Sequence, residues 1–137
     1  MERRTLNPNG NSNKCLDVKD GVFTNGTPVQ IWDCNNTGSQ RWVVGLGFTT
    51  VRLANTNFCL DSSFATPPNG TVAKIWQCIN DIPAQQWSFT AIIMGGRITL
   101  GNQSICLDLN KGDVTNGNVV QTWQCLGNSN QAWTNGA

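Results

Sequence analysis

Six cysteines in three evenly spaced pairs constrain the fold of this chain more than any other feature. The pairs are Cys15 and Cys34, Cys59 and Cys78, and Cys106 and Cys125, and the members of each pair are 19 residues apart. The sequence has no histidine and no C-x-x-C pair, so we expect no metal site and no cofactor. The equal spacing favours a disulfide within each pair, closing a loop of about 20 residues and stabilising the fold by roughly 3 kcal/mol. Three such bonds indicate an oxidising compartment.

The cysteines belong to a motif that occurs three times and fills the chain. Each copy reads Cys-Leu-Asp, then Asn-Gly, then Trp-x-Cys, then Gln-x-Trp, with a period of 44 to 47 residues. We expect a single domain, residues 1–137, with repeats of approximately 1–47, 48–94 and 95–137. Three copies are too few for the blades of a propeller, so a closed threefold barrel fits better.

The segments inside each copy are short, β-rich and separated by turn signals, which predicts an all-β fold. The Asn-Gly dipeptide recurs at the same place in each copy and predicts a hairpin-like pair of strands. Alternation along the first copy places Leu16 and Val18 inward and Asp17 outward, while Trp32 lies on the polar face of the partner strand. Trp76 and Trp123 occupy the same position in the other copies.

The strand register follows from the disulfides if bridged cysteines lie directly opposite each other in an antiparallel pair. Under that hypothesis Asp17 faces Trp32, and the same offset pairs Asp61 with Trp76 and Asp108 with Trp123.

An exposed tryptophan beside an aspartate has the chemistry of a sugar pocket. The indole packs on the C–H face of a sugar ring, and the carboxylate accepts hydrogen bonds from adjacent hydroxyls. The alternative is that these tryptophans only shield the disulfides and that the aspartates hold turns. Recurrence on the polar face favours binding for Trp32, Trp76 and Trp123. In contrast, Trp42, Trp87 and Trp133 each follow a Gln-x step, and the first two lead into apolar residues such as Val43 and Phe89, so all three are predicted to lie in the core.

These motifs resemble the ricin B-type lectin family, which is also found as carbohydrate-binding modules of glycoside hydrolases and is marked by three Gln-x-Trp repeats. The resemblance covers essentially the whole chain. It implies a β-trefoil of twelve strands with pseudo-threefold symmetry, and a potential pocket in each repeat for galactose-type or xylan-type sugars.

The family's pocket residues map unequally onto the three repeats. The third repeat has the full set of Asp108, Gln121, Trp123, Asn130 and Gln131. The first repeat has Asp17, Gln30, Trp32 and Gln40, with Ser39 in place of the asparagine. The second has Asp61, Trp76 and Gln85, with Lys74 and Ala84 at the other positions and one extra residue before Gln85. We therefore rank the third site first and the second site last.

The sequence also addresses other classes of function. An enzyme is disfavoured because there is no histidine and the only glutamate is Glu2. A trefoil protease inhibitor or protein-interaction domain remains an alternative, and the Pro-rich segment 63–68 is its candidate loop. A net charge of +1 provides no field for nucleic acid or an anionic membrane surface, and no apolar run is long enough for membrane insertion.

The expected partner is a glycan or polysaccharide, and the sequence leaves the oligomeric state open. The N-terminal Met1-Glu2-Arg3-Arg4 lacks the apolar stretch of a secretory signal. The disulfides nevertheless favour a secreted, extracellular protein, with a cytoplasmic location as the alternative.

Overall fold

The computed structural model describes residues 3–45, 47–89 and 96–136, so Met1 and Glu2 of the N-terminal segment lie outside the described residues. The described chain forms strands and short 3-10 helices. The strands are β1 (Arg3–Pro8), β2 (Lys14–Val18), β3 (Val29–Asp33), β4 (Trp42–Val43), β5 (Gly47–Thr49), β6 (Arg52–Leu53), β7 (Phe58–Asp61), β8 (Thr71–Val72), β9 (Lys74–Gln77), β10 (Trp87–Phe89), β11 (Ile98–Leu100), β12 (Ile105–Leu109), β13 (Val120–Gln124) and β14 (Trp133–Gly136). The 3-10 helices are η1 (Lys19–Gly21), η2 (Gly38–Gln40), η3 (Pro83–Gln85), η4 (Asn110–Gly112) and η5 (Ser129–Gln131).

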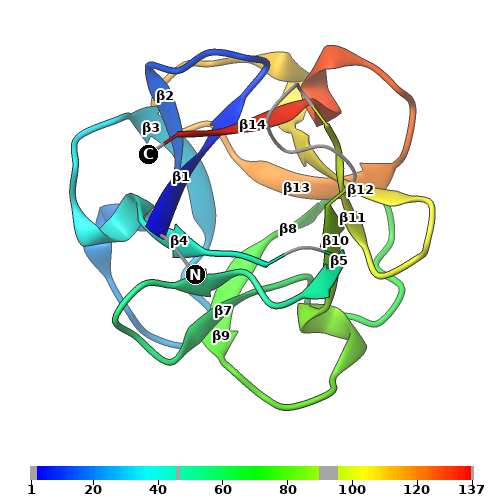
Figure 1. Cartoon of the computed structure of the whole chain (residues 1–137). Helices are drawn as coiled ribbons and strands as arrows, with labels where there is room; N and C mark the ends of the chain where they lie inside the picture. The colour runs from blue at the N-terminus through cyan, green and yellow to red at the C-terminus, as the bar shows by residue number, and fades with distance from the viewer. Residues whose placement is uncertain (1–2, 46, 90–95, 137) are drawn as a thin grey trace.

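Two strands from each repeat form an antiparallel barrel. The three repeats form three lobes around the barrel axis (Figure 1). Strand β1 pairs with β14 and β4, and β4 pairs with β6. Strand β10 pairs with β5 and β11, and a bridge between Gly96 and Trp133 closes the ring. Closure matters physically because it leaves no unpaired strand edge.

The remaining strands form one hairpin per repeat, β2–β3, β7–β9 and β12–β13, which together cap the barrel. Neighbouring hairpins are joined by Pro28 with Lys74, by Gln30 with Val119, and by β13 with β8. The described residues contain fourteen strand segments, and β5/β6 and β8/β9 are each one strand interrupted by one or two residues. The twelve strands that the family resemblance implied are thereby present, and the β-trefoil is confirmed.

The inward residues predicted by alternation are buried. Leu16, Val18, Val29 and Ile31 are fully inaccessible, as are their counterparts such as Leu60, Ile75 and Leu107. The core prediction for Trp42, Trp87 and Trp133 is also confirmed, because all three are fully buried. Each indole Nε1 donates to a carbonyl oxygen of the Cys-Leu-Asp leucine, at 3.0 to 3.1 Å. Burying an indole of about 200 Å² contributes about 5 kcal/mol, so these three residues anchor the barrel.

The three predicted disulfides are present, but the register inferred from them is wrong by two residues. Cys15 lies opposite Trp32, and Asp17 lies opposite Gln30. The same shift places Asp61 opposite Lys74 and Asp108 opposite Gln121. The physical reason is that Cys34 lies beyond the end of β3 and reaches back to Cys15 diagonally, with a Cα–Cα distance of 5.1 Å. Aspartate and tryptophan still share one face of each hairpin, as diagonal neighbours.

Candidate functional site

Each Cys-Leu-Asp aspartate is buried at the end of the first hairpin strand, where amide side chains hold it. In the third repeat Gln121 donates to Oδ1 of Asp108 at 3.1 Å and Gln131 donates to Oδ2 at 2.9 Å. In the first repeat Gln30 donates to Oδ2 of Asp17 at 3.0 Å. The carboxylates are only 4 and 5% exposed, so amide hydrogen bonds are needed to offset their desolvation.

The glutamine side chain of each Gln-x-Trp motif is buried, and its polar atoms make hydrogen bonds to other groups of the protein. Gln131 Nε2 donates both to Asp108 and to the carbonyl of Gln124, while its Oε1 accepts the N–H of Leu126. Gln85 makes the same three bonds in the second repeat. In the first repeat Gln40 joins the carbonyl of Asp33 to the N–H of Asn35. These glutamines are therefore equipped to position the aspartate and the following loop, rather than to contact a ligand directly.

The pocket tryptophans lie at the surface, as their polar-face placement predicted. Trp32 is 40% exposed, and Trp76 and Trp123 are partly exposed. All three are far more accessible than the fully buried tryptophans of the Gln-x-Trp motifs. The indoles are thus available for stacking against a ligand.

Two of the three predicted sites form open hollows. A cavity of about 300 Å³ in the third repeat brings together Asp108, Gln121, Trp123 and Asn130. A cavity of about 330 Å³ in the first repeat brings together Asp17, Gln30 and Trp32, with Ser39 in the position of the asparagine. Within the described residues the side-chain amide of Asn130 makes no hydrogen bond, so it can serve a ligand. Pockets of this size suit one or two sugar rings.

The predicted pocket of the second repeat is closed at its tryptophan by a local contact. Lys74, which replaces the pocket glutamine, places Nζ 4.8 Å from the ring centroid of Trp76. This cation–π contact covers the indole that a sugar would need. Asp61 accepts the backbone N–H of Ser63 at 2.6 Å and the Gln85 amide at 3.0 Å, so a backbone group takes the place that a pocket glutamine has on the aspartate of the other two repeats. Asp61 and Gln85 are bonded neighbours, but Lys74 closes the stacking face of Trp76 beside them.

Sequence reasoning missed the loop residues that wall the two open pockets. Additional lining residues are Asp20, Gly21, Asn35 and Thr37 in the first repeat, and Asn110, Lys111, Leu126 and Asn128 in the third. A signal was available, because a glycine follows each open site's aspartate by four residues and is absent from the second repeat. Gly112 lies so close to Asn130 that an added Cβ would stand 2.5 Å from its Oδ1, so a larger residue would displace the pocket amide.

The first pocket contains a carboxyl with a perturbed pKa. Burial raises the pKa of Asp17 above its ordinary value of 3.8, and the nearby charge of Asp20 adds to the rise. Hydrogen bonds from Gln30 and Gln40 lower the pKa of this carboxyl but do not cancel the effect of burial. The carboxylate of Asp17 is therefore protonated at a higher pH than that of a solvent-exposed aspartate.

Another hollow lies away from the predicted pockets. It measures about 470 Å³, lies beside the Cys59–Cys78 disulfide, and is lined by Phe48, Arg52 and Asp81 among others. Of the predicted site residues it includes only Gln85, and it has no tryptophan. This hollow lacks the exposed indole and the hydrogen-bonded pocket carboxylate of the other two pockets. We therefore place the candidate sites in the first and third repeats.

Across 3–45, 47–89 and 96–136 no three His, Cys, Asp or Glu side chains are grouped so that they could hold a metal ion. The same ranges contain no helix of the length and apolarity needed to cross a membrane.

The barrel, the three hairpins and the Asp–Trp pockets together define a lectin-type β-trefoil. The family model of the ricin-type beta-trefoil lectin domain matches residues 5–133, and the chain belongs to this family. Membership supports carbohydrate binding, and the family is generally non-catalytic.

Solved structures agree with this assignment. ThreeFoil, a designed threefold symmetric protein, superposes with a TM-score of 0.88 at 20% identity, covering 98% of both chains. An exo-β-1,3-galactanase from Clostridium thermocellum gives 0.83 at 29% identity, over 99% of this chain and 30% of the enzyme. The ricin B-like lectin of Macrolepiota procera, solved with lactose, gives 0.80 at 20% identity, over 98% of this chain and 94% of that lectin.

The chain matches only short stretches of much longer curated relatives. Nigrin b of Sambucus nigra is 45% identical over 38 residues, which are 28% of this chain and 7% of nigrin b. The shared stretch is therefore far shorter than the domain.

Proposed function

We propose that this protein is a lectin that binds glycans through the Asp–Trp pockets of its third and first repeats. The observation that carries the proposal is the pair of amides on Asp108. Gln121 and Gln131 each hold one carboxylate oxygen, at 3.1 and 2.9 Å, beside a hollow lined by Trp123 and the unbonded amide of Asn130. A carboxylate oxygen has two lone pairs, so each can still accept a sugar hydroxyl while the amides fix its direction.

The proposed ligand is a galactose-type sugar, with xylan-type sugars as the alternative. Two similar proteins support the first choice: the M. procera lectin was solved with lactose, and the C. thermocellum enzyme is a galactanase. Neighbouring galactose hydroxyls of different orientation suit one carboxylate and one amide, while the apolar face of the ring stacks on Trp123.

We propose that the function is binding without turnover. The three pocket aspartates belong to separate repeats, and each is held by its own amides, so they do not pair with one another as the two carboxylates of a glycoside hydrolase do. The unmodified chain is expected to release no product from aryl glycosides. Turnover that disappears in Asp108→Ala would instead identify an enzyme.

A polysaccharide-targeting role within a larger protein is the second candidate. It is favoured by the galactanase, in which a domain similar to this whole chain makes up 30% of the enzyme. In either setting the individual sites are shallow and weak, and binding to clustered glycans gains avidity from more than one pocket. The three disulfides support a secreted protein in both cases.

A glycan array tests the proposal when it is run on the unmodified chain and on three single variants. Asp108→Ala should remove most of the signal from galactose-terminated glycans, Asp17→Ala should remove less, and Asp61→Ala should change it little. Equal losses from all three variants would show that the second pocket is open. No signal from any galactoside or xylan would overturn the proposed function.

A further inference from the structure

The Asn-Gly turn of each repeat contacts the pocket tryptophan of another repeat. Oδ1 of Asn69 in the second repeat accepts the backbone N–H of Gln124, the residue directly after Trp123, at 2.7 Å. Oδ1 of Asn116 in the third repeat accepts the N–H of Asp33, directly after Trp32, at 2.9 Å. The cycle is completed when Asn25 of the first repeat accepts the N–H of Gln77, directly after Trp76, at 2.7 Å.

The glycine of the same turn holds the backbone on the other side of the tryptophan. Gly70 donates its N–H to the carbonyl of Thr122, directly before Trp123, at 2.9 Å, and Gly117 donates to Ile31, directly before Trp32, at 2.8 Å. Gly26 does the same to Ile75. Each pocket tryptophan is thus clamped between two hydrogen bonds from one turn, whose asparagine is 52 or more residues from its partner in sequence.

The clamping glycine lies near the indole, at a distance where an added Cβ would make an ordinary van der Waals contact. A Cβ added at Gly70 would stand 3.6 Å from Cζ3 of Trp123, and one added at Gly117 would stand 3.9 Å from Cζ3 of Trp32. Both glycines have φ near +90°, at +89° and +93°, in the left-handed region that favours glycine. The turn therefore needs Asn-Gly in that order: an acceptor first, then a residue without a side chain.

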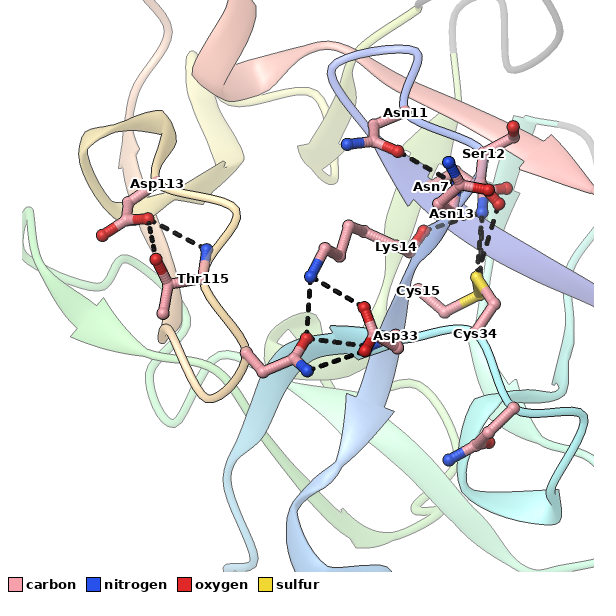
Figure 2. Close-up of polar contacts among 12 residues, drawn as sticks. Asn7, Asn11, Ser12, Asn13, Lys14, Cys15, Asp33, Cys34, Asp113 and Thr115 are labelled. Atoms are coloured by element: carbon pink, nitrogen blue, oxygen red, sulfur yellow. Dashed lines mark hydrogen bonds and ion pairs between the residues drawn. A yellow bond between two sulfur atoms is a disulfide. The ribbon is translucent and has the colours of Figure 1, made fainter.

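The clamp on the first pocket has extra polar bracing. Lys14 Nζ lies 2.8 Å from Asp33 Oδ1 and donates to Asn116 Oδ1 at 2.9 Å, and Figure 2 shows Lys14 and Asp33 next to the Cys15–Cys34 disulfide. Within the turn itself Asp113 accepts both the N–H and the hydroxyl of Thr115, at 2.9 and 2.6 Å (Figure 2). These contacts fix the turn before any ligand arrives.

We propose that the sugar pockets are shared between repeats: Asn69 and Gly70 of the second repeat are positioning residues for the third pocket, and Asn116 and Gly117 of the third repeat are positioning residues for the first. This inference rests on the proposed function. It gives the second repeat a binding role although its own pocket is closed, because its turn orients Trp123. Preorganising the indole lowers the ordering cost of stacking, so loosening the clamp weakens binding.

Asn69→Ala tests the proposal in an Asp17→Ala background, where only the third pocket remains. Lactose and xylotriose are the probes, titrated by calorimetry. We expect Asn69→Ala to weaken binding about tenfold, the effect of losing one hydrogen bond to an otherwise unpaired N–H. Asn69→Asp keeps the Oδ1 acceptor and should bind like its parent. If Asn69→Ala does not fold, Asn69→Ser, whose hydroxyl is too short to reach Gln124, takes its place.

Asn25→Ala is the matched control. It removes the equivalent hydrogen bond from the equivalent turn of the first repeat, but it loosens Trp76, whose stacking face is covered by Lys74. We expect it to lower the melting temperature as much as Asn69→Ala and to leave affinity for both probes unchanged. In an Asp108→Ala background, Asn116→Ala should weaken the remaining first pocket.

Two results would overturn the proposal separately from the proposed function. Equal losses from Asn69→Ala and Asn25→Ala at the third pocket would mean that the turns act only on global stability. Unchanged affinity in Asn69→Ala, with Asp108→Ala still abolishing third-pocket binding, would show that the clamp is irrelevant to a genuine site. If the unmodified chain binds neither probe, the proposed function falls and this inference falls with it.

Discussion

The side-chain amide of Gln131 donates a hydrogen bond of 2.9 Å to Oδ2 of Asp108, and the same nitrogen holds the carbonyl of Gln124 at 2.9 Å. One glutamine therefore fixes both the pocket carboxylate and the end of the strand that carries Trp123. The same Gln-x-Trp motif contains Trp133, whose buried indole donates a hydrogen bond to the carbonyl of Leu107 in the core. Core packing and pocket geometry are thus coupled through two residues of one motif.

Replacing Gln131 by Ala is expected to reduce both stability and binding. The change leaves the buried Asp108 carboxylate and the carbonyl of Gln124 each short of one partner, at a cost of about 1–3 kcal/mol. Chemical denaturation should show a lower free energy of unfolding, and lactose binding by the third pocket should fall. Gln124→Ala, which removes an exposed side chain from the neighbouring strand, is the control and should leave both quantities close to those of the parent.

Acidification is expected to weaken sugar binding by the first pocket at a higher pH than it would if Asp17 had the pKa of an ordinary aspartate. The pKa of Asp17 is raised, mainly by burial, so the carboxylate that we propose as the acceptor of sugar hydroxyls is protonated at a pH above its ordinary 3.8. In an Asp108→Ala background, affinity should fall as the pH drops through this raised pKa. Loss of affinity only below pH 3.8 would contradict the account.

The raised pKa of Asp17 also predicts how stability depends on pH, in the direction opposite to that of binding. Because the folded state takes up the proton first, acidification from the raised pKa down to 3.8 increases the contribution of Asp17 to stability, and rising pH through that window removes it. Asp17→Asn should abolish this part of the pH dependence. Denaturation curves of the two proteins across the window measure the difference directly.

Opening the face of Trp76 should not by itself create a third binding site. Lys74→Gln removes the cation that lies 4.8 Å from the Trp76 ring, but Ala84 still stands where the third pocket has the amide of Asn130. In an Asp17→Ala and Asp108→Ala background we expect lactose binding to stay undetectable by calorimetry. A new binding isotherm in this variant would show that the lysine alone closes the second pocket.

Much of the fold could be predicted because its determinants repeat. Equal cysteine spacing identified the disulfides, and strand alternation identified Leu16, Val29 and Ile31 as core and Trp32 as surface. The register could not be derived, because Cys34 lies past the end of its strand and bridges diagonally to Cys15. A disulfide constrains two Cα atoms to 5.1 Å here, and a diagonal pair satisfies that distance.

The candidate site was only partly predictable for a related reason. Asp108, Trp123 and Asn130 could be placed in one pocket from their motif positions, and the structure brings them together. The buried role of Gln131 and the clamp from Asn69 to Gln124 could not be anticipated. The clamp joins residues 55 apart in different repeats, and only closure of the barrel brings them together.

Calorimetric titration with lactose tests the central claim most directly, on the unmodified chain, on Asp108→Ala and on Asp17→Ala combined with Asp108→Ala. We predict two sites per chain for the unmodified protein, one weaker site for Asp108→Ala, and no binding for the double variant, with all three proteins folded. Binding that persists in the double variant would contradict the assignment of sugar recognition to the first and third Asp–Trp pockets.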